Sequence, residues 1–306
     1  VEVASNDGYL LQFFKQYGVP ALGIEPAENC AAVAAGKGID TWVRFFGVEA
    51  ARQIVDQGLQ ADLLIGNNVL AHVSDLNDFV AGLSAALKRS GVITLEFAHL
   101  LRLIEKNAFD TVYQEHYSYL SLMALVTIFA HHGLAVFDVE EPETHGGSLR
   151  VYAGHNSQSR VQSDRVAAVL SEERAAGLAD METYGAFGAQ VRQASEAFRS
   201  YLIEARAAGK RVAAYGAAAK GNTLLNVSRI DGQLIEFVAD ISPHKQGMFM
   251  PGSHLPIFGP EKILQERPDI VVILPWNIER EVTEKLAAVY DWGGKFVVAI
   301  PEIREC

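Results

Sequence analysis

The sequence has little cysteine and no long hydrophobic run. Cys30 and Cys306 are its two cysteines, and this scarcity argues against a disulfide framework and against a zinc site within the chain. No apolar run approaches the roughly 18 residues that a membrane-spanning helix requires, and the N-terminus lacks the basic and then apolar pattern of a signal peptide. These absences lead us to expect a protein of the reducing cytoplasm.

Basic residues are also scarce. The chain has 26 Lys and Arg against 37 Asp and Glu, a formal net charge of -11, and the basic residues are scattered. This distribution argues against a nucleic-acid partner, so an anionic substrate must be met by local basic residues and backbone N–H groups. With 306 residues and 49% hydrophobic content, the chain can form two domains. Val1 already lies in a strand-like run, so we expect that the start is cut from a longer chain.

The first 155 residues alternate short apolar runs with helical patterns, as in an α/β domain with a mainly parallel sheet. The short turn PETHG joins the last two strand candidates, so we expect them to pair antiparallel. Seven strands ending in such a hairpin predict a class I methyltransferase (Rossmann-like) fold over residues 1–156, because a dinucleotide-binding domain usually continues parallel. The expected strands are 1–4, 20–25, 39–43, 61–66, 91–97, 133–141 and 147–154, and the expected helices are 9–17, 27–35, 48–55, 76–87 and 120–131.

The second half of the chain has a different organisation. From residue 161 to residue 207, apolar side chains recur at spacings of three and four, which predicts a long amphipathic helix in a connector of residues 157–208. The alternation then resumes over residues 209–306 and predicts a second, smaller Rossmann-like α/β domain. Its expected strands are 211–217, 234–240, 269–275 and 295–300, with helices near 261–265 and 278–289.

The opening stretch VEVASNDGYLL contains a strand that stops at small residues and passes through Gly8 into a helix. Such a loop lets the backbone approach a ligand closely and points helix N–H groups at it. Ala4 and Asn6 stand where the dinucleotide fingerprint G-x-G-x-x-G has its first two glycines, so that fingerprint is missing. A tight strand-to-helix turn without a ligand is the alternative interpretation of this stretch taken alone.

Further residues at the same sheet edge indicate an adenosyl ligand. Glu25 ends the second strand, where a carboxylate can accept hydrogen bonds from both ribose hydroxyls. Amide side chains follow the fourth strand at this edge, and aromatic residues after the third strand offer a wall for a base. The residues that we expect to bind the cofactor are Glu2, Ala4, Asn6, Gly8, Glu25, Pro26, Phe45, Phe46, Asn67 and Asn68.

Five motifs together resemble a known enzyme family. VEVASNDGYLL, GIEPA, VLAHVSD, YQEHYSYLS and HGGSLRVY are similar to the S-adenosylmethionine-dependent C-methyltransferases that act on nucleotide-linked deoxysugars, such as the sugar 3-C-methyltransferases. The resemblance covers essentially the whole chain and implies S-adenosylmethionine as the cofactor and a nucleotide-linked sugar as the substrate. In that family a cysteine-bearing zinc module precedes the methyltransferase domain, so zinc is expected only in a module that this chain does not contain.

Methylation of carbon requires a base that removes a proton beside a ketone and donors that stabilise the resulting enolate. The resemblance assigns the role of base to His116 of YQEHYSYLS, and we interpret Tyr113 as a hydrogen-bond donor near the ketone. Glu115 is interpreted as a residue that orients the sugar or the base, and His72 matches a second active-site histidine of the family. The alternatives are a surface histidine at 116, a structural histidine at 72, and packing or hydration roles for Tyr113 and Glu115.

Two further regions are expected to meet the substrate. The HGGS stretch opens the last strand and is interpreted as a cleft lip, with a plain turn as the alternative. In the C-terminal domain, the loop of residues 216–222 follows a strand and opens a helix, which suits a diphosphate although the spacing is not that of a Walker A loop. A Rossmann repeat used only for packing is the alternative there. The expected substrate-binding residues are His145, Ser148, Arg150, Gly216, Lys220, Asn222, Asp240 and Lys245.

The motifs favour a C-methyltransferase acting on a nucleoside-diphosphate ketosugar. Two Rossmann-like domains also suit an NAD(P)-dependent oxidoreductase, but neither loop carries G-x-G-x-x-G. A non-catalytic module that binds nucleotide-sugars is a third hypothesis.

Overall fold

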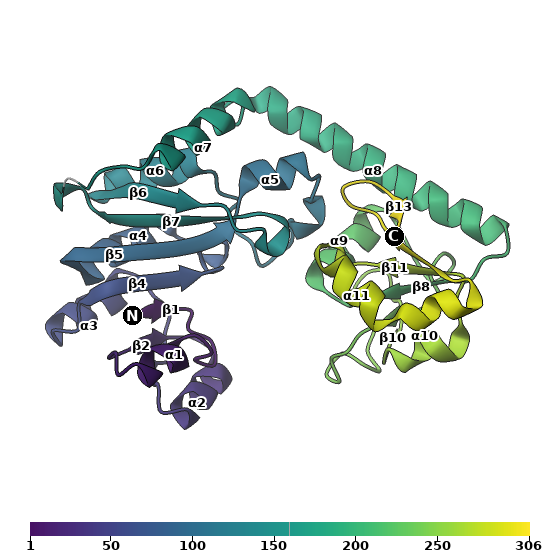
Figure 1. Cartoon of the computed structure of the whole chain (residues 1–306), viewed down its shortest axis with the longest axis horizontal. Coiled ribbons are helices and arrows are strands. Elements are labelled where there is room, and N and C mark those ends of the chain that lie inside the picture. The colour runs from purple at the N-terminus through teal and green to yellow at the C-terminus, as the bar shows by residue number, and fades with distance from the viewer. Residues whose placement is uncertain (159) are drawn as a thin grey trace. The chain divides into compact units, whose positions relative to one another are not determined.

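The computed structural model describes residues 1–158 and 160–306, and for His145 it describes the backbone alone. The chain divides into two compact units (Figure 1). The first consists of Val1–Leu101 and Glu115–Ala179, and the second of Arg102–Gln114 and Asp180–Cys306. Residues 102–114, which the sequence pattern placed in the first domain, therefore belong to the second unit.

The first unit contains a seven-stranded sheet in the order β3-β2-β1-β4-β5-β7-β6, counted over its described residues. β7 pairs antiparallel with both β5 and β6, and the other pairings are parallel. This is the predicted class I methyltransferase fold with its terminal hairpin. The strands are β1 (Glu2–Val3), β2 (Leu22–Ile24), β3 (Asp40–Trp42), β4 (Ala61–Asn67), β5 (Leu87–Ala98), β6 (Leu134–Glu140) and β7 (Ser148–His155).

Helices connect these strands and bury their apolar faces against the sheet. Leu64 and Phe97 on the strands and Phe79 and Phe129 on the helices belong to one buried apolar cluster. Side-chain caps fix two helix starts, because Asp75 accepts from the backbone N–H of Asp78 and Ser121 from that of Ala124. The helices are α1 (Leu11–Gln16), α2 (Glu28–Gly36), α3 (Val48–Asp56), α4 (Leu76–Ala86), α5 (Leu100–Glu105), α6 (Leu122–His131) and α7 (Asp164–Ala175), and the 3-10 turns η1 (Leu70–His72) and η3 (Thr144–Gly146) lie between them.

The single helix predicted over residues 161–207 is wrong. Two helices occupy this stretch, α7 and α8 (Met181–Ala207), and α8 is the long helix labelled in Figure 1. Gly177 has a φ of 72°, a left-handed conformation that commonly ends helices and that glycine adopts without strain. The apolar spacing continues through this break, which is why the periodicity alone suggested one helix.

The second unit contains a smaller sheet in the order β10-β9-β8-β11-β12-β13, with β13 antiparallel to β12 and the other pairings parallel. The strand order reverses between β8 and β11, as in a doubly wound Rossmann-like fold. Two short strands, β10 and β13, were not expected. The strands are β8 (Val212–Tyr215), β9 (Val238–Ala239), β10 (Ile257–Phe258), β11 (Ile270–Ile273), β12 (Lys295–Val298) and β13 (Arg304–Glu305), and the helices after α8 are α9 (Ala219–Val227), α10 (Glu261–Glu266) and α11 (Glu279–Lys285).

Candidate functional site

The loop after β1 has the backbone shape of a glycine-rich loop, although it contains one glycine. Ala4, Asn6 and Gly8 all have positive φ, at 56°, 52° and 74°. Glycine is also required at position 8 for steric reasons, because a Cβ atom there would lie 2.5 Å from the Cδ1 of Ile39. Positions 4 and 6 thus adopt the conformation that glycine favours in a nucleotide-binding loop, which the letters alone do not show.

Glu25 joins this loop to the end of β2. Its two carboxylate oxygens accept the backbone N–H groups of Asn6 and Ala27, each at 2.9 Å. A carboxylate has about four lone-pair sites, so each oxygen keeps one for a ligand hydroxyl. The side chain is therefore fixed in place while it still has accepting capacity.

Glu2 lies in β1 beside β2, where it pairs with Gly23. Its side chain is 1% exposed, and its Oε2 has no hydrogen-bond partner among the described residues. Burial raises the pKa of Glu2 to about 7, partly offset by the nearby N-terminal ammonium group. A buried carboxyl group with an unsatisfied oxygen suits a cationic or hydrogen-bond-donating ligand.

The other expected cofactor residues follow β2, β3 and β4. Asn67 ends β4, and the backbone N–H of Asn68 donates to the carbonyl of Glu96 at 2.7 Å. Phe46 packs edge-on against Phe79 at 5.3 Å and is part of the core. Phe45 is 84% exposed, so of the two aromatic residues it is the one that offers a ring to a ligand, and the half-buried Pro26 follows Glu25.

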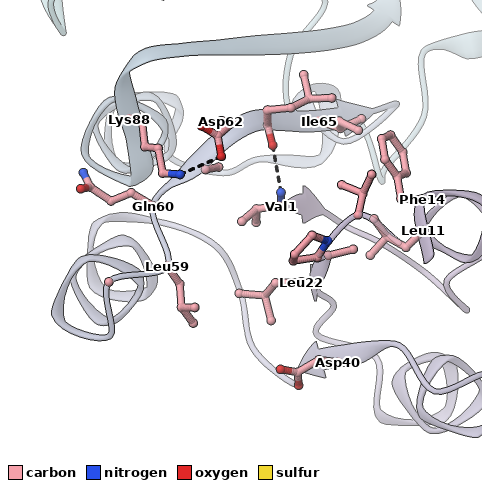
Figure 2. Close-up of a pocket in the computed structure, with 16 residues that line it drawn as sticks. Val1, Leu11, Phe14, Leu22, Asp40, Leu59, Gln60, Asp62, Ile65 and Lys88 are labelled. Carbon is pink, nitrogen blue, oxygen red and sulfur yellow. Dashed lines mark hydrogen bonds and ion pairs between the residues drawn. The ribbon is translucent and has the colours of Figure 1, made fainter. Parts of the chain in front are cut away.

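A cavity of about 490 Å³ lies at the opposite edge of the sheet (Figure 2). Its lining includes Val1, Leu22, Ala61 and Lys88, which stand at the starts of strands. The Val1 amino group donates to the carbonyl of Leu63 at 2.9 Å beside this cavity. None of the ten expected cofactor residues is among its described lining residues, so the cavity is separate from the candidate site.

Two histidines that are distant in sequence lie together in the first unit. The rings of His72, on η1, and His116 are 4.8 Å apart in an edge-to-face arrangement, and the ring of Tyr119 lies 5.8 Å from that of His116. The Nδ1 of His72 is 3.0 Å from the backbone carbonyl of Glu115. A carbonyl only accepts, so His72 donates from Nδ1, and in its neutral form its Nε2 is an acceptor. The backbone N–H of Tyr117 also donates to the carbonyl of Ala71 at 2.7 Å.

The structure thus brings together His72, His116 and the backbone of Glu115, while the Glu115 side chain is exposed. Tyr113 belongs to the second unit, because the boundary between the units falls between Gln114 and Glu115. The sequence analysis did not select Tyr119, although its position in the YQEHYSYLS motif could have indicated that it lies near His116.

A buried pair of side chains, His99 and Glu173, lies at the C-terminal end of the YQEHYSYLS motif. His99, which follows β5, is fully buried, and its Nε2 lies 2.7 Å from Oε1 of the fully buried Glu173 on α7. Glu173 also accepts the backbone N–H groups of Leu122 and Met123 at the start of α6. The backbone N–H of Leu100 donates to the carbonyl of Leu120 at 3.0 Å, so the pair anchors the chain just beyond Tyr119.

The expected substrate residues on the last hairpin have partners in the hairpin and on the neighbouring β5. Ser148 is fully buried, and its hydroxyl donates to the carbonyl of Thr144 at 3.1 Å. Arg150 forms ion pairs with Glu96 at 2.6 Å and with Glu140 at 3.2 Å, and the bond to Glu96 raises the pKa of its guanidinium. The side chain of His145 lies outside the described residues.

The second unit repeats the strand, loop and acid arrangement of the first. Gly216 has a φ of 92°, and a Cβ there would lie 2.4 Å from the Cδ of Pro275. Asp240, directly after β9, accepts the backbone N–H groups of Ala217 at 2.7 Å and Ser242 at 2.8 Å. Lys245 donates to the carbonyl of Ala217 at 2.8 Å. Asp240 and Lys245 therefore flank the loop.

Lys220 lies on the first turn of α9. Its Nζ donates to the Oδ1 of Asn277 at 2.7 Å and lies 5.1 Å from the ring of Trp276, and burial lowers its pKa. The Oδ1 of Asn222 is buried without a hydrogen-bond partner among the described residues. Asp110, which sequence reasoning missed, accepts the indole N–H of Trp276 at 2.9 Å. The position of Asp110, three residues before the YQEHYSYLS motif, is the sequence feature that could have indicated it.

Metal-binding clusters and membrane-spanning helices are both missing from the part of the chain that the structure describes. No group of three or more His, Cys, Asp or Glu residues among them is arranged to hold a metal ion. No helix within residues 1–158 and 160–306 is both long and apolar enough to cross a membrane.

The sheet order of the first unit and its β1 loop define a class I methyltransferase fold. Residues 1–139 match the model of a methyltransferase domain, and residues 143–301 match that of the C-methyltransferase C-terminal domain. The chain is 37% identical over 304 residues to the C-methyltransferase NovU of Streptomyces niveus, covering 99% of this chain and 72% of NovU. The chain therefore belongs to the S-adenosylmethionine-dependent C-methyltransferase family, and its cofactor is S-adenosylmethionine. This membership decides against the oxidoreductase and non-catalytic hypotheses.

Solved methyltransferase structures are also similar to part of the chain. Magnesium protoporphyrin IX methyltransferase from Synechocystis with bound S-adenosylmethionine is 16% identical, with a TM-score of 0.38 over 51% of this chain and 68% of that chain. An S-adenosylmethionine-dependent methyltransferase from Anabaena variabilis is 15% identical, with a TM-score of 0.41 over 51% of this chain and 76% of that chain. Similarity of this size carries no information about the substrate.

Proposed function

We propose that this enzyme methylates a carbon atom beside the ketone of a nucleoside-diphosphate ketosugar, with His116 as the base. The pairing of His116 with His72 carries this proposal, because it gathers two histidines from separate segments into one cluster. The ketosugar as substrate is supported by the resemblance of YQEHYSYLS and HGGSLRVY to the sugar C-methyltransferases.

The carboxyl ends of β1, β2 and β4 fit the cofactor. S-adenosylmethionine, when bound, supplies an electrophilic methyl group on a positively charged sulfur. Glu25 would accept hydrogen bonds from the ribose hydroxyls, and the unsatisfied oxygen of Glu2 suits the positively charged part of the molecule. The loop of residues 4–8 lets its backbone approach the ligand, and Phe45 would offer its exposed ring to the base.

The chemical step needs a proton acceptor and a donor. Neutral His116 would take the proton from the carbon beside the ketone, which leaves an enolate whose carbon would bond to the methyl group as the methyl–sulfur bond breaks, with S-adenosylhomocysteine as the leaving group. The Tyr113 hydroxyl would donate to the enolate oxygen, and the product would be the C-methylated ketosugar. His116 would then return the proton to solvent. His72 holds the carbonyl of Glu115 and so positions the backbone directly before the base.

The second unit would bind the nucleotide part of the substrate. Its loop of residues 216–222 lies at the carboxyl end of β8, next to β11 at the point where the strand order reverses, which is where ligands bind in such sheets. Lys220 would contribute positive charge to a diphosphate. The amide oxygen of Asn222, which has no hydrogen-bond partner among the described residues, would accept a hydrogen bond from a substrate hydroxyl. Asp240 would orient the loop through the N–H of Ala217.

Methyl transfer from radiolabelled S-adenosylmethionine to a panel of thymidine- and uridine-diphosphate ketosugars tests this proposal. We expect label in one or more ketosugars and none in the matching sugars whose ketone has been reduced to an alcohol. Equal labelling of the reduced sugars would contradict an enolate mechanism. Transfer to sugars that lack the nucleotide, at the same rate, would contradict the role of the second unit.

A further inference from the structure

Asp110 is a buried carboxyl group that the proposed chemistry does not use. It lies in the 3-10 turn η2 (Phe109–Thr111) and is fully buried. One oxygen accepts the indole N–H of Trp276, and the other, Oδ1, has no hydrogen-bond partner among the described residues. Burial raises the pKa of Asp110 to about 6, while Lys220 and the bond from Trp276 oppose that rise. A buried carboxylate oxygen without a hydrogen-bond partner lowers the stability of the fold, so the presence of Asp110 at this position calls for an explanation.

Lys220 is the cation that interacts electrostatically with Asp110, and both residues contact Trp276. The carboxylate opposes the fall in the pKa of Lys220 that burial causes, so the two groups stabilise each other's charged forms. Lys220 also donates to Asn277 and lies over the ring of Trp276, the residue that binds Asp110. These contacts lie within the second unit, at the reversal of strand order between β8 and β11.

Asp110 sits on the segment that leads into the catalytic motif. Phe109 is buried in the apolar core of the second unit, and Asn107 donates to the carbonyl of Pro301 at 3.4 Å. Asp110 is followed three residues later by Tyr113 and six residues later by His116. Phe109 and Asp110 therefore tie this segment to the second unit through one apolar and one polar contact.

We propose that Asp110 is a positioning residue that couples occupation of the Lys220 site by a diphosphate to the conformation of the chain entering residues 113–116. The inference rests on the proposed nucleotide-binding role of the second unit. A diphosphate and the Asp110 carboxylate compete for the charge of Lys220. When the phosphate takes that charge, the carboxylate loses its counter-charge, and the segment that carries it is less firmly held. Binding of the nucleotide part is thereby communicated to the residues that flank the base.

The test uses the full chain and thymidine diphosphate as the probe. Asp110→Asn keeps an oxygen for the Trp276 N–H and removes the charge that competes for Lys220. We expect calorimetry to show about fivefold tighter binding of thymidine diphosphate to Asp110→Asn than to the wild type. A purely structural role predicts weaker binding. The matched control is Glu284→Gln, an exposed carboxylate on α11, which should leave the affinity unchanged.

Hydrogen exchange supplies the second measurement. In the wild type, saturating thymidine diphosphate should speed exchange of the amides of residues 109–113 about threefold or more, and in Asp110→Asn this response should be absent. Unchanged or weaker binding by Asp110→Asn, or the same exchange response in both proteins, would overturn the role of Asp110. Lys220→Met separates the two proposals: if it leaves the affinity unchanged, or if the wild type does not bind the probe, the nucleotide site itself is wrong and the role of Asp110 falls with it.

Discussion

His72 donates from Nδ1 to the backbone carbonyl of Glu115 at 3.0 Å, one residue before His116. This bond fixes the tautomer of neutral His72 and ties the turn η1 after β4 to the YQEHYSYLS segment. The backbone carbonyl of Glu115 therefore has His72 as its partner, while the Glu115 carboxylate is exposed. The positioning role that we propose for His72 and the proton transfer that we propose for His116 are therefore separable by mutation.

His116→Gln should abolish the base and leave the cofactor site intact. We expect methyl transfer to fall at least about 100-fold, because general-base catalysis typically contributes that much or more. Calorimetric affinity for S-adenosylhomocysteine should stay within about twofold of the wild type. Exchange of the substrate's acidic proton for deuterium in D₂O, measured by mass spectrometry without methyl transfer, should fall in parallel.

The control for this experiment is His131→Gln, an exposed histidine at the end of α6. It should leave both transfer and exchange unchanged. If His116→Gln retained deuterium exchange while losing methyl transfer, another residue would have to be the base.

Glu25→Ala should weaken cofactor binding by about tenfold or more. The change removes the acceptor of the Asn6 and Ala27 N–H groups, which fix the loop, and removes the proposed ribose acceptor. Calorimetry with S-adenosylhomocysteine measures the effect. Glu28→Gln, an exposed carboxylate in the first turn of α2, is the matched control and should bind normally. Normal binding by Glu25→Ala would exclude Glu25 from the cofactor site.

Glu173→Gln should destabilise the first unit by about 2 to 4 kcal/mol, because it removes a buried charged acceptor shared by His99, Leu122 and Met123. Urea denaturation measures the free energy of unfolding. The neighbouring Glu172 is exposed, so Glu172→Gln should change it by less than about 0.5 kcal/mol. Equal effects of the two substitutions would show that the buried contacts of Glu173 contribute no special stability.

Glu2 should make stability depend on pH. Its pKa is raised from 4.5 to about 7 in the folded protein, so its contribution to stability is fully present below pH 4.5 and is lost as the pH rises through 7. The full shift corresponds to about 3 kcal/mol. The free energy of unfolding of Glu2→Gln, minus that of the wild type, should therefore be larger at pH 8 than at pH 5. Glu49→Gln, at an exposed carboxylate of α3, should show no such difference between the two pH values.

The fold of both units could be predicted, because short apolar runs alternate with helical patterns along the sequence. Parallel strands place their carboxyl ends at one edge, so Glu25 and Asn67 could be expected on the same edge. The register pairs Glu2 with Gly23 and Ile65, two positions before each of them. The loop shape at Ala4 and Asn6 was not readable, because neither residue type demands a positive φ. The break at Gly177 was hidden by apolar spacing that continues on both sides of it.

The placement of residues 102–114 could not be predicted, since it depends on contacts distant in sequence. Phe109 packs with residues of the second unit such as Phe198 and Leu224, and Asp110 bonds to Trp276, which is 166 positions away. The His99–Glu173 pair spans 74 positions and was missed for the same reason. Such contacts follow from how whole elements pack, and no local pattern records them.

The boundary between the units is crossed three times by the chain, after Leu101, after Gln114 and after Ala179. A hybrid enzyme made by joining two relatives at a single point near residue 180 would combine one parent's residues 102–114 with the other parent's α9 and β11. Asp110 would then face a foreign lysine and tryptophan, and Phe109 a foreign core. Exchange of substrate preference between relatives should therefore succeed only when the short inserted segment and the C-terminal portion are transplanted together.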